Sequence, residues 1–324
     1  MSLSDILIPI QKDIDELENV MIELLSSTVP FVQSVAEHTL KNGGKRLRPI
    51  LTLVCAKLAG FHGKAAHKMG SCIEFVHTAS LLHDDVVDNA KVRRGKPSAN
   101  AKWGNHVSVL VGDFFYCRAS QLLTEQGNLK ILKVVTDAIT GLTEGEVLEI
   151  TKNLDLSTSE TDYLAIIKNK TAILFAAACQ IGGILGNISS EFELALRDYG
   201  LNLGMAFQLS DDALDYTASE EIFGKTSGID LQEGKLTLPL ITAIKRATPD
   251  EQTLIKNALI ADKIDKAILQ NVNDIITKYD GFNETYKTAK QYINLAKEHI
   301  APFRPSIEKD ILLYIADYIV ARDR

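Results

Sequence analysis

Proline is absent from a long central part of the chain, between Pro97 and Pro239. A proline inside a helix removes a backbone hydrogen bond and costs about 3 kcal/mol or more, so long helices exclude it. Strand signals are weak, because no Asn-Gly or Asp-Gly pair lies between two short apolar runs. The sequence therefore predicts an all-α fold, in which helices of about 15 to 25 residues are joined by short turns into a bundle.

Helix boundaries are marked by local signals. The capping-box spacing Ser/Thr-x-x-Glu occurs at 157–160, 190–193 and 248–251, and each predicts a helix start. Gly127-Asn128 and Gly186-Asn187 predict helix ends. No linker or change of composition divides the chain, so we expect one domain over residues 1–324. Residues 1–40 are expected to form a helical segment at the edge of the bundle or of a dimer.

Composition and charge exclude several classes of protein. Hydrophobic residues make up 46% and charged residues 24%, as in ordinary globular proteins. The net charge of −7 argues against nucleic-acid binding, so an anionic ligand needs local basic residues or metal ions. The N-terminus lacks the pattern of a signal peptide, and the apolar stretch 172–186 is too short to span a bilayer. We expect a cytoplasmic protein without a transmembrane segment, in which 172–186 forms a core helix and the four cysteines are buried free thiols.

An acidic pattern occurs twice, each time at the end of an apolar run. The six carboxylates are Asp84, Asp85 and Asp88 in the first motif, and Asp211, Asp212 and Asp215 in the second. Residues four apart share one face of a helix, where like charges repel unless a cation binds. Such oxygen ligands suit Mg²⁺, which also keeps waters and takes substrate phosphates. A solvated acidic face is the alternative, but two copies in an apolar context favour a metal site.

Basic residues accompany both acidic motifs. They are Lys45 and Arg48 in the segment GGKRLRP, Arg93 and Arg94 after the first acidic motif, Lys170 near a helix boundary, and Lys225 and Lys235 after the second motif. Each cluster alone is a weak signal. Alternating acidic and basic clusters suggest that metals hold a diphosphate while lysine and arginine hold the remaining phosphate charge. His77 and Gln208 each lie seven residues before an aspartate of a motif, on the same helical face.

Five segments resemble one known family. In chain order they are GGKRLRP, LLHDDVVDNAKVRRGKPSAN, KTAILF, FQLSDDALDY and FGKTSGIDLQEGKLTLPL. In this order they resemble the trans-prenyltransferase (polyprenyl diphosphate synthase) family, most of all its bacterial octaprenyl diphosphate synthase branch. The resemblance covers Lys41 to Pro239 and continues toward the C-terminus; Ser210 and Ala213 depart from the larger apolar residues usual in the family. It implies a single-domain all-α barrel of long helices around a deep central cavity, usually a homodimer.

The resemblance also implies a reaction and its residues. An allylic diphosphate ionises, its carbocation alkylates isopentenyl diphosphate, and a proton is lost, with two or three Mg²⁺ per active site. The implied catalytic residues are Asp84, Asp88, Lys170, Asp211 and Asp215. Isopentenyl diphosphate would be bound by Lys45, Arg48, His77 and Arg94. The allylic substrate, with farnesyl diphosphate expected, would be bound by Arg93, Lys170, Thr171, Gln208, Lys225 and Lys235.

Product length is predicted from two small residues. Ala79 and Ser80 lie about one helical turn before Asp84, where aromatic residues would close the space beneath the allylic substrate. Their small size predicts a product longer than farnesyl diphosphate. The resemblance implies that this product is octaprenyl diphosphate for quinone side chains, which would be passed to a membrane. Phe114 and Phe115 are candidates for stopping the growing tail, unless they are ordinary core residues.

Several alternatives stay open at this point. A shorter-chain synthase making farnesyl or geranylgeranyl diphosphate would share all the charged motifs. A terpene cyclase would share the metals but would not need GGKRLRP, and a helical scaffold would not need paired acidic and basic clusters. The pair His83-Asp84 also occurs in metal-dependent phosphohydrolases, but no further histidines are suitably spaced.

Overall fold

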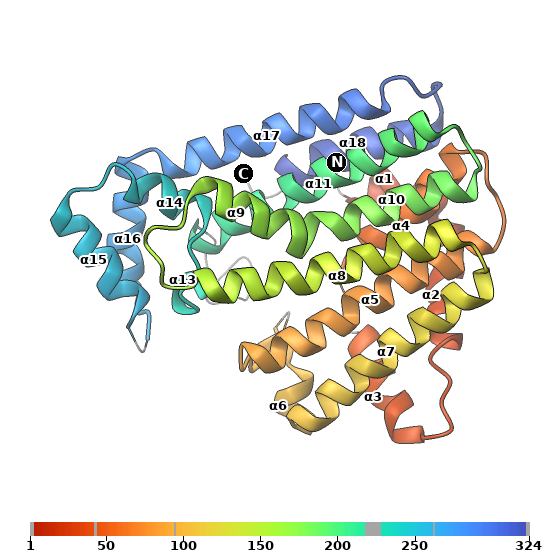
Figure 1. Ribbon diagram of the computed structural model, residues 1–324, viewed down its shortest axis with the longest axis horizontal. Helices are drawn as coiled ribbons and strands as arrows, with labels where there is room; N and C mark the ends of the chain where they lie inside the picture. Colours follow the sequence, from red (N-terminus) through yellow and green to blue (C-terminus); the bar gives the residue numbers. More distant parts are fainter. Residues whose placement is uncertain (1–2, 42–43, 94, 218–227, 262, 322–324) are drawn as a thin grey trace. The chain divides into compact units, whose positions relative to one another are not determined.

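The computed structural model describes residues 3–41, 44–93, 95–217, 228–261 and 263–321, and nearly all regular structure there is helical (Figure 1). From the N-terminus the elements are α1 (Leu3–Leu7), η1 (Ile8–Ile10), α2 (Gln11–Glu23), α3 (Pro30–Lys41), α4 (Leu47–Leu58), α5 (Ala65–Val87), β1 (Val92–Arg93), β2 (Lys96–Pro97), α6 (Ala99–Trp103), α7 (Asn105–Gln126) and α8 (Leu129–Lys152). They continue as α9 (Glu160–Ile167), η2 (Lys168–Ala172), α10 (Ile173–Leu185), α11 (Ser190–Thr217), α13 (Ile229–Gln232), α14 (Leu238–Ile244), α15 (Pro249–Leu259), α16 (Lys266–Lys278), α17 (Gly281–Ile300) and α18 (Ile307–Ala321).

The chain divides into two compact units. Unit 1 comprises Met1–Ile139, Leu174–Gly200 and His299–Ile315, and unit 2 comprises Thr140–Ile173, Leu201–Glu298 and Ala316–Arg324. The first acidic motif lies in unit 1 and the second in unit 2. The single domain with a deep central cavity stays a prediction.

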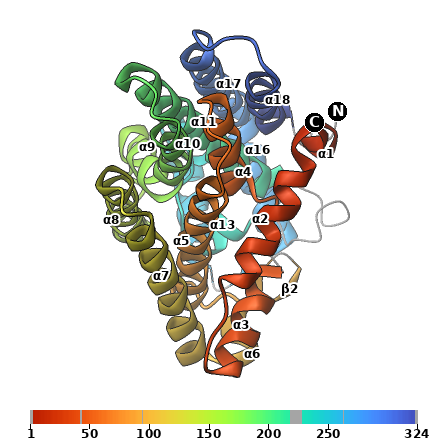
Figure 2. The same ribbon diagram turned by 90° about the vertical axis from the view of Figure 1, so that its right-hand side faces the viewer.

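In unit 1, α5 packs along both α4 and α7 (Figures 1 and 2). Phe75 of α5 meets Phe115 of α7 with ring centroids 5.4 Å apart, and both side chains are fully buried. Two turns further along, the Nε2 atom of His83 lies 3.1 Å from the carbonyl oxygen of Val109. Contacts along this length hold α5, which carries the first acidic motif, against α7.

In unit 2, α16 packs against both α14 and α15 (Figure 1). The predicted helix start at Thr248 is confirmed, because the Thr248 hydroxyl and the Glu251 carboxylate form a complete capping box at the start of α15. Glu251 also accepts hydrogen bonds from the side chains of Lys278 (2.7 Å) and Tyr279 (2.7 Å). This one carboxylate therefore joins the start of α15 to the end of α16.

Two other predicted helix starts are displaced. The first capping box forms between Ser159 and Asp162 instead of 157–160, because Ser157 bonds to Asp155 in the preceding turn. At 190–193 the capping hydroxyl belongs to Ser189, which faces the backbone nitrogen of Phe192 at 3.5 Å. The carboxylate of residue 193 is buried instead, where it accepts hydrogen bonds from the side chains of Lys130 and Gln180.

Local geometry confirms the helix ends and corrects the strand prediction. Gly127 takes the left-handed conformation at φ 65°, and in the second pair the left-handed residue is Asn187 rather than Gly186. A short antiparallel pair, β1 with β2, was not predicted; Arg93 pairs with Lys96 across a turn that contains Gly95 at φ 74°. The usual hairpin signal was missing because residues 92–97 contain neither Asn-Gly nor Asp-Gly.

Within the described residues, one helical run, 160–185, has the length and composition of a membrane span, but 61% of its most apolar window is buried. Burial of this kind is typical of a core helix. Cys55, Cys72 and Cys179 are buried free thiols, while Cys117 is a free thiol at the surface. All four cysteines are free, as predicted, but the prediction of a buried thiol is wrong for Cys117.

Candidate active site

The two acidic motifs have the same pattern of burial. The first lies at the end of α5 and the second in the last turns of α11. In each, the first and last aspartates are half-buried, whereas the middle one is buried. The half-buried pairs are Asp84 with Asp88 in unit 1, and Asp211 with Asp215 in unit 2. The i, i+4 spacing thus places two carboxylates of each motif on an accessible face.

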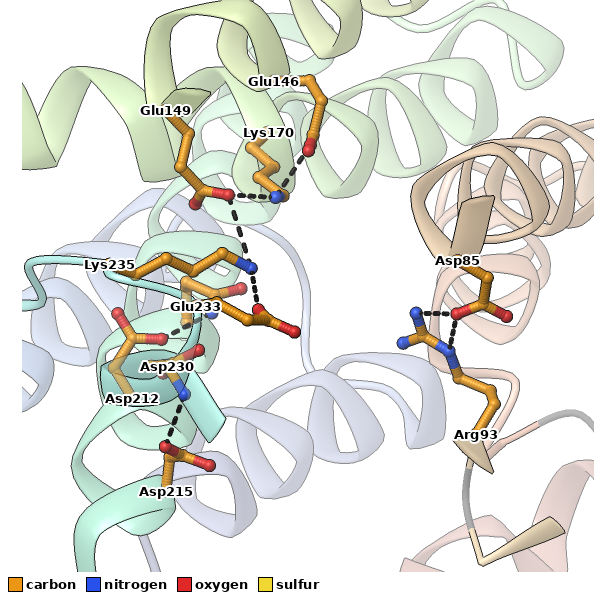
Figure 3. Close-up of polar contacts among 11 residues, drawn as sticks. Asp85, Arg93, Glu146, Glu149, Lys170, Asp212, Asp215, Asp230, Glu233 and Lys235 are labelled. Atoms are coloured by element: carbon orange, nitrogen blue, oxygen red, sulfur yellow. Dashed lines mark hydrogen bonds and ion pairs between the residues drawn. The ribbon is translucent and has the colours of Figure 1, made fainter. Parts of the chain in front are cut away.

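Asp85, the middle residue of the first motif, is paired with Arg93 from strand β1 (Figure 3). The Nε atom of Arg93 donates to its carboxylate at 2.8 Å, and a second guanidinium nitrogen donates to the same oxygen. The side-chain amide of Asn100 donates to the backbone carbonyl of Asp85 at 2.8 Å. Both groups hold the basic loop against the end of α5. In the first motif, the middle carboxylate is engaged by the protein rather than turned outward.

Asp212, the middle residue of the second motif, is engaged in a similar way. The hydroxyl of Tyr163 and the side-chain amide of Gln208 each donate to its carboxylate at 2.6 Å. Burial raises the pKa of Asp212 to about 7, although these two hydrogen bonds oppose the shift. The sequence grouped all six aspartates as metal ligands, but the structure separates the two middle ones by their burial.

A cavity of about 90 Å³ in unit 2 brings together several residues predicted to bind the allylic substrate. Lys170, Thr171, Gln208 and Lys235 all line it. The hydroxyl of Thr171 donates to the side-chain oxygen of Gln208 at 2.7 Å, which orients the amide nitrogen toward the second acidic motif. Lys225 lies outside the described residues.

Lys170 sits in η2, a single π-helical turn between α9 and α10. Such turns are rare and frequent at functional sites. Its ammonium group contacts the carboxylates of Glu146 at 2.7 Å and Glu149 at 2.5 Å, both on α8 (Figure 3). Gly145 lets the two segments approach closely, because a β-carbon there would stand 2.6 Å from the backbone nitrogen of Lys170.

Lys235 is held by a glycine-dependent turn after α13. Gly234 has φ 75°, and a β-carbon there would stand 2.6 Å from the Cδ2 atom of Leu154. The backbone N–H of Leu154 donates to the Gly234 carbonyl at 2.9 Å. The Lys235 ammonium contacts Glu233 at 2.6 Å and Glu149 at 3.6 Å. These contacts fix where the lysine enters the cavity.

A further buried carboxylate lies beside the second motif. The backbone N–H of Asp230 donates to the Asp215 carboxylate at 3.0 Å. Burial, and then repulsion from Asp215 and Asp212, raise the pKa of the Asp230 carboxyl well above its ordinary value. Sequence reasoning quoted Asp230 in the loop motif but assigned it no role, and it did not find Glu146, Glu149 or Glu233. The spacing of these three glutamates on α8 and in the loop does not indicate a site. Only the fold brings the lysines to them.

Unit 1 holds a second cavity, of about 50 Å³, lined by His77 and Arg93 among others. A guanidinium nitrogen of Arg48 lies 3.2 Å from the Nε2 atom of His77, and the guanidinium stacks 4.4 Å from the ring centre of Phe175. Two residues predicted to bind isopentenyl diphosphate are thus in contact. Lys45 is exposed just before α4, and Arg94 lies outside the described residues.

Arg46, inside GGKRLRP, has a structural role that the sequence did not reveal. It takes the left-handed conformation at φ 52°, immediately before α4. Its guanidinium contacts Glu74 at 2.6 Å and Glu18 at 3.0 Å, and the side chains of Arg46 and Glu74 are buried. The pair joins the start of α4 to α5 and α2. It thereby sets the start of the helix that carries Arg48.

The two residues predicted to control product length lie on different faces of α5. Ala79 is fully buried, between Phe75 and His83 on the face that contacts α7. Ser80 is half-buried on the face of Asp84, and its hydroxyl donates to the His77 carbonyl at 2.9 Å. Phe115 is an ordinary core residue, which was the alternative to a role in stopping the tail, while Phe114 is half-buried. The role of all four residues in product length stays a prediction.

His83 does not resemble a metal ligand of a phosphohydrolase. Its ring lies against α7, where it contacts the Val109 carbonyl and, at 3.5 Å, the carboxylate of Asp113. Gly112 leaves room for the ring, because a β-carbon there would overlap it. Within the described ranges, no three His, Cys, Asp or Glu side chains are already gathered as a metal site.

Comparisons with known proteins identify the family of this chain. Residues 29–276 match the family model described as polyprenyl synthetase. The chain is 40% identical over 313 residues to octaprenyl diphosphate synthase of Escherichia coli K12, covering 97% of both chains. It is 42% identical over 256 residues to an all-trans-nonaprenyl-diphosphate synthase (geranyl-diphosphate specific) of Rhodobacter capsulatus, covering 79% of this chain and 78% of that one.

A solved structure extends the likeness to the fold. Polyprenyl synthase from Caulobacter crescentus CB15, complexed with calcium and isoprenyl diphosphate, matches with a TM-score of 0.94 and 39% identity, covering 100% of this chain and 98% of that chain. The chain therefore belongs to the polyprenyl synthetase family and is an all-α trans-prenyl diphosphate synthase, a prenyltransferase. The family generally uses Mg²⁺ and condenses isopentenyl diphosphate with an allylic diphosphate. The cyclase and scaffold alternatives are set aside.

Proposed function

We propose that this enzyme is a long-chain synthase whose product is octaprenyl diphosphate. The observation that carries the proposal is the 40% identity to the Escherichia coli octaprenyl enzyme over 97% of both chains. The Rhodobacter capsulatus relative, named for a nonaprenyl product, aligns over a smaller share of this chain. A long product also agrees with the small side chains at Ala79 and Ser80.

Catalysis must stabilise the departing diphosphate, because the barrier is charge separation at a carbon–oxygen bond. We assign this role to Lys170, with Thr171, Gln208 and Lys235, which share its cavity, and with Arg93 and Lys225. Asp84, Asp88, Asp211 and Asp215 are the proposed Mg²⁺ ligands, because they are the half-buried pairs of hard oxygen donors. Two or three bound Mg²⁺ ions would neutralise phosphate charge and so make the diphosphate a better leaving group.

The second substrate is assigned to residues of unit 1. Arg48 and His77, which are in contact, would bind the diphosphate of isopentenyl diphosphate, together with Lys45 and Arg94. A charge-assisted contact of this kind contributes about 1.5 to 3 kcal/mol. No protein nucleophile is required, since the new bond joins a carbocation to a double bond. The released pyrophosphate would take up the proton that is lost.

The direct test is a product analysis. The purified enzyme would be incubated with isopentenyl diphosphate and either farnesyl or geranyl diphosphate, and the dephosphorylated products separated by mass. Octaprenol is the expected main product, with farnesyl diphosphate the better primer. Farnesol or geranylgeraniol as end product would replace the long-chain proposal by a short-chain one. Pyrophosphate release without isopentenyl diphosphate would instead point to cyclisation.

The cellular setting is proposed from the family. We propose a homodimer that works in the cytoplasm and passes its lipid product to a membrane for attachment to a quinone precursor. Residues 1–40 would lie at the edge of the dimer. Light scattering after gel filtration would give the mass of the complex, and a monomeric mass in active fractions would contradict the dimer.

A further inference from the structure

Three carboxylates surround two lysines at the cavity of unit 2 (Figure 3). Glu146 contacts Lys170 at 2.7 Å, and Glu233 contacts Lys235 at 2.6 Å. Glu149 contacts both lysines, at 2.5 Å and 3.6 Å, through the same oxygen, Oε2. Both ammonium nitrogens therefore lie within 3.6 Å of one oxygen atom.

This arrangement opposes the repulsion between the two lysines. Like charges at short distance repel strongly when water is largely excluded, and here the side chains are mostly buried: 22% exposed for Lys170, 15% for Lys235 and 17% for Glu149. A shared carboxylate offsets this repulsion and gives both flexible side chains a common partner. The other two glutamates cannot do the same, because each contacts a different lysine.

Two glycines let the backbone segments that carry the two lysines pack closely at α8 and just beyond its end. Gly145 allows α8 to touch the π-helical turn of Lys170, and Gly234 allows the loop of Lys235 to pack on Leu154 just beyond α8. Glu149 lies on α8 between these two approaches, and its side chain lines the cavity together with both lysines. Three segments that are distant in sequence thus converge on one carboxylate.

We infer that Glu149 is a positioning residue that holds Lys170 and Lys235 together as a paired cationic site for a diphosphate group. Two ammonium groups that share one oxygen are close enough to contact neighbouring phosphates of one diphosphate. The carboxylate itself is not a ligand of that group, because it carries the same sign of charge. The inference rests on the proposed assignment of this cavity to the allylic diphosphate and identifies the residue that organises it.

The test uses Glu149→Gln, which keeps the shape of the side chain and removes its charge. The matched control is Glu144→Gln, the same change at an exposed position of the same helix. Glu149→Gln is expected to raise KM for farnesyl diphosphate about 10-fold, while KM for isopentenyl diphosphate changes less than about 2-fold. Glu144→Gln is expected to leave both values at the wild-type level. A general loss of structure would instead change both KM values and lower the melting temperature.

A second background separates positioning from a direct role. In Lys170→Met, Glu149 loses its nearer partner and keeps only Lys235, so its negative charge beside the diphosphate is less well compensated. Adding Glu149→Gln to Lys170→Met is therefore expected to leave KM for farnesyl diphosphate unchanged or to lower it, whereas the same change raises KM in the wild-type background. Equal losses in both backgrounds would overturn the inference, as would a Glu149→Gln enzyme that matches Glu144→Gln. Inactivity of the wild-type enzyme with any allylic diphosphate would count against the proposed function instead.

Discussion

Gly145 of α8 lies against the backbone nitrogen of Lys170, so closely that a β-carbon on the glycine would stand 2.6 Å from it. Alanine at this position would force α8 and the π-helical turn apart.

Gly145→Ala is expected to lower the free energy of unfolding by about 1 to 3 kcal/mol, although alanine favours helix by about 1 kcal/mol. It should also lower kcat, because Lys170 moves with its turn. Urea unfolding and steady-state kinetics check this, with Glu144→Ala as control; a Gly145→Ala enzyme as stable and active as wild type would show that the turn tolerates displacement.

Metal dependence follows from the half-buried aspartate pairs. Removal of divalent metals with EDTA should abolish turnover, and added Mg²⁺ should restore it. Asp84→Ala and Asp211→Ala should each lower kcat about 100-fold or more, because each removes a ligand of the ions that neutralise the leaving group. Asp137→Ala is the control, since this exposed carboxylate pairs with Lys133 on α8. Near-native kcat for Asp84→Ala would contradict the metal assignment.

The assignment of the two diphosphates predicts opposite kinetic effects. Arg48→Ala should raise KM for isopentenyl diphosphate about 10- to 150-fold, and KM for the allylic substrate much less. Lys170→Ala should do the reverse. Initial rates with one substrate varied and the other saturating measure both values. Arg197→Ala serves as a control, because this guanidinium pairs with the adjacent Asp198. If Arg48→Ala changed both KM values equally, the division of the sites would be wrong.

Substitutions on the two faces of α5 test which face controls the length of the product. Ala79→Tyr should shorten the product to geranylgeranyl diphosphate or less at a comparable initial rate, because packed walls yield little to an added ring. Ser80→Tyr places the ring on the half-buried face instead. Mass analysis of the products and the melting temperature of each variant are the measurements. Shortening by Ser80→Tyr alone would mean that the tail follows the face of Asp84. Wild-type length from both variants would remove the physical basis of the long-chain argument.

The link between α15 and α16 predicts a pH-dependent stability. Hydrogen bonds from Lys278, then from Thr248 and Tyr279, lower the pKa of Glu251 from 4.5 to about 2. A lowered carboxyl pKa stabilises the fold fully above pH 4.5, and this contribution is lost as the pH falls toward 2. Glu251→Gln should therefore lower the urea midpoint at pH 7, and its difference from wild type should shrink between pH 4.5 and 2. Asp250→Asn, one residue away, is the control; a difference that does not change with pH would contradict the linkage.

The all-α fold and the acidic motifs were predictable because they depend on local sequence. Long helices exclude proline, so a long segment without proline indicates such helices. A DDxxD spacing places its first and last aspartates on one helical face wherever the helix lies. The capping box at Thr248 was read correctly for the same reason. The other two boxes were displaced because neighbouring groups, Asp155 for one and Lys130 for the other, competed for the capping side chains.

What the tertiary structure decided was which side chain meets which. Only the packing shows that Asp85 and Asp212 turn to Arg93 and to Tyr163, because helical periodicity says which residues share a face but not what covers it. The role of Glu149 was hidden in the same way. Its partners lie 21 and 86 positions further along the chain, and the sequence around Glu149 does not indicate them. Charges that are far apart along the chain become one electrostatic unit only when folding removes the water between them.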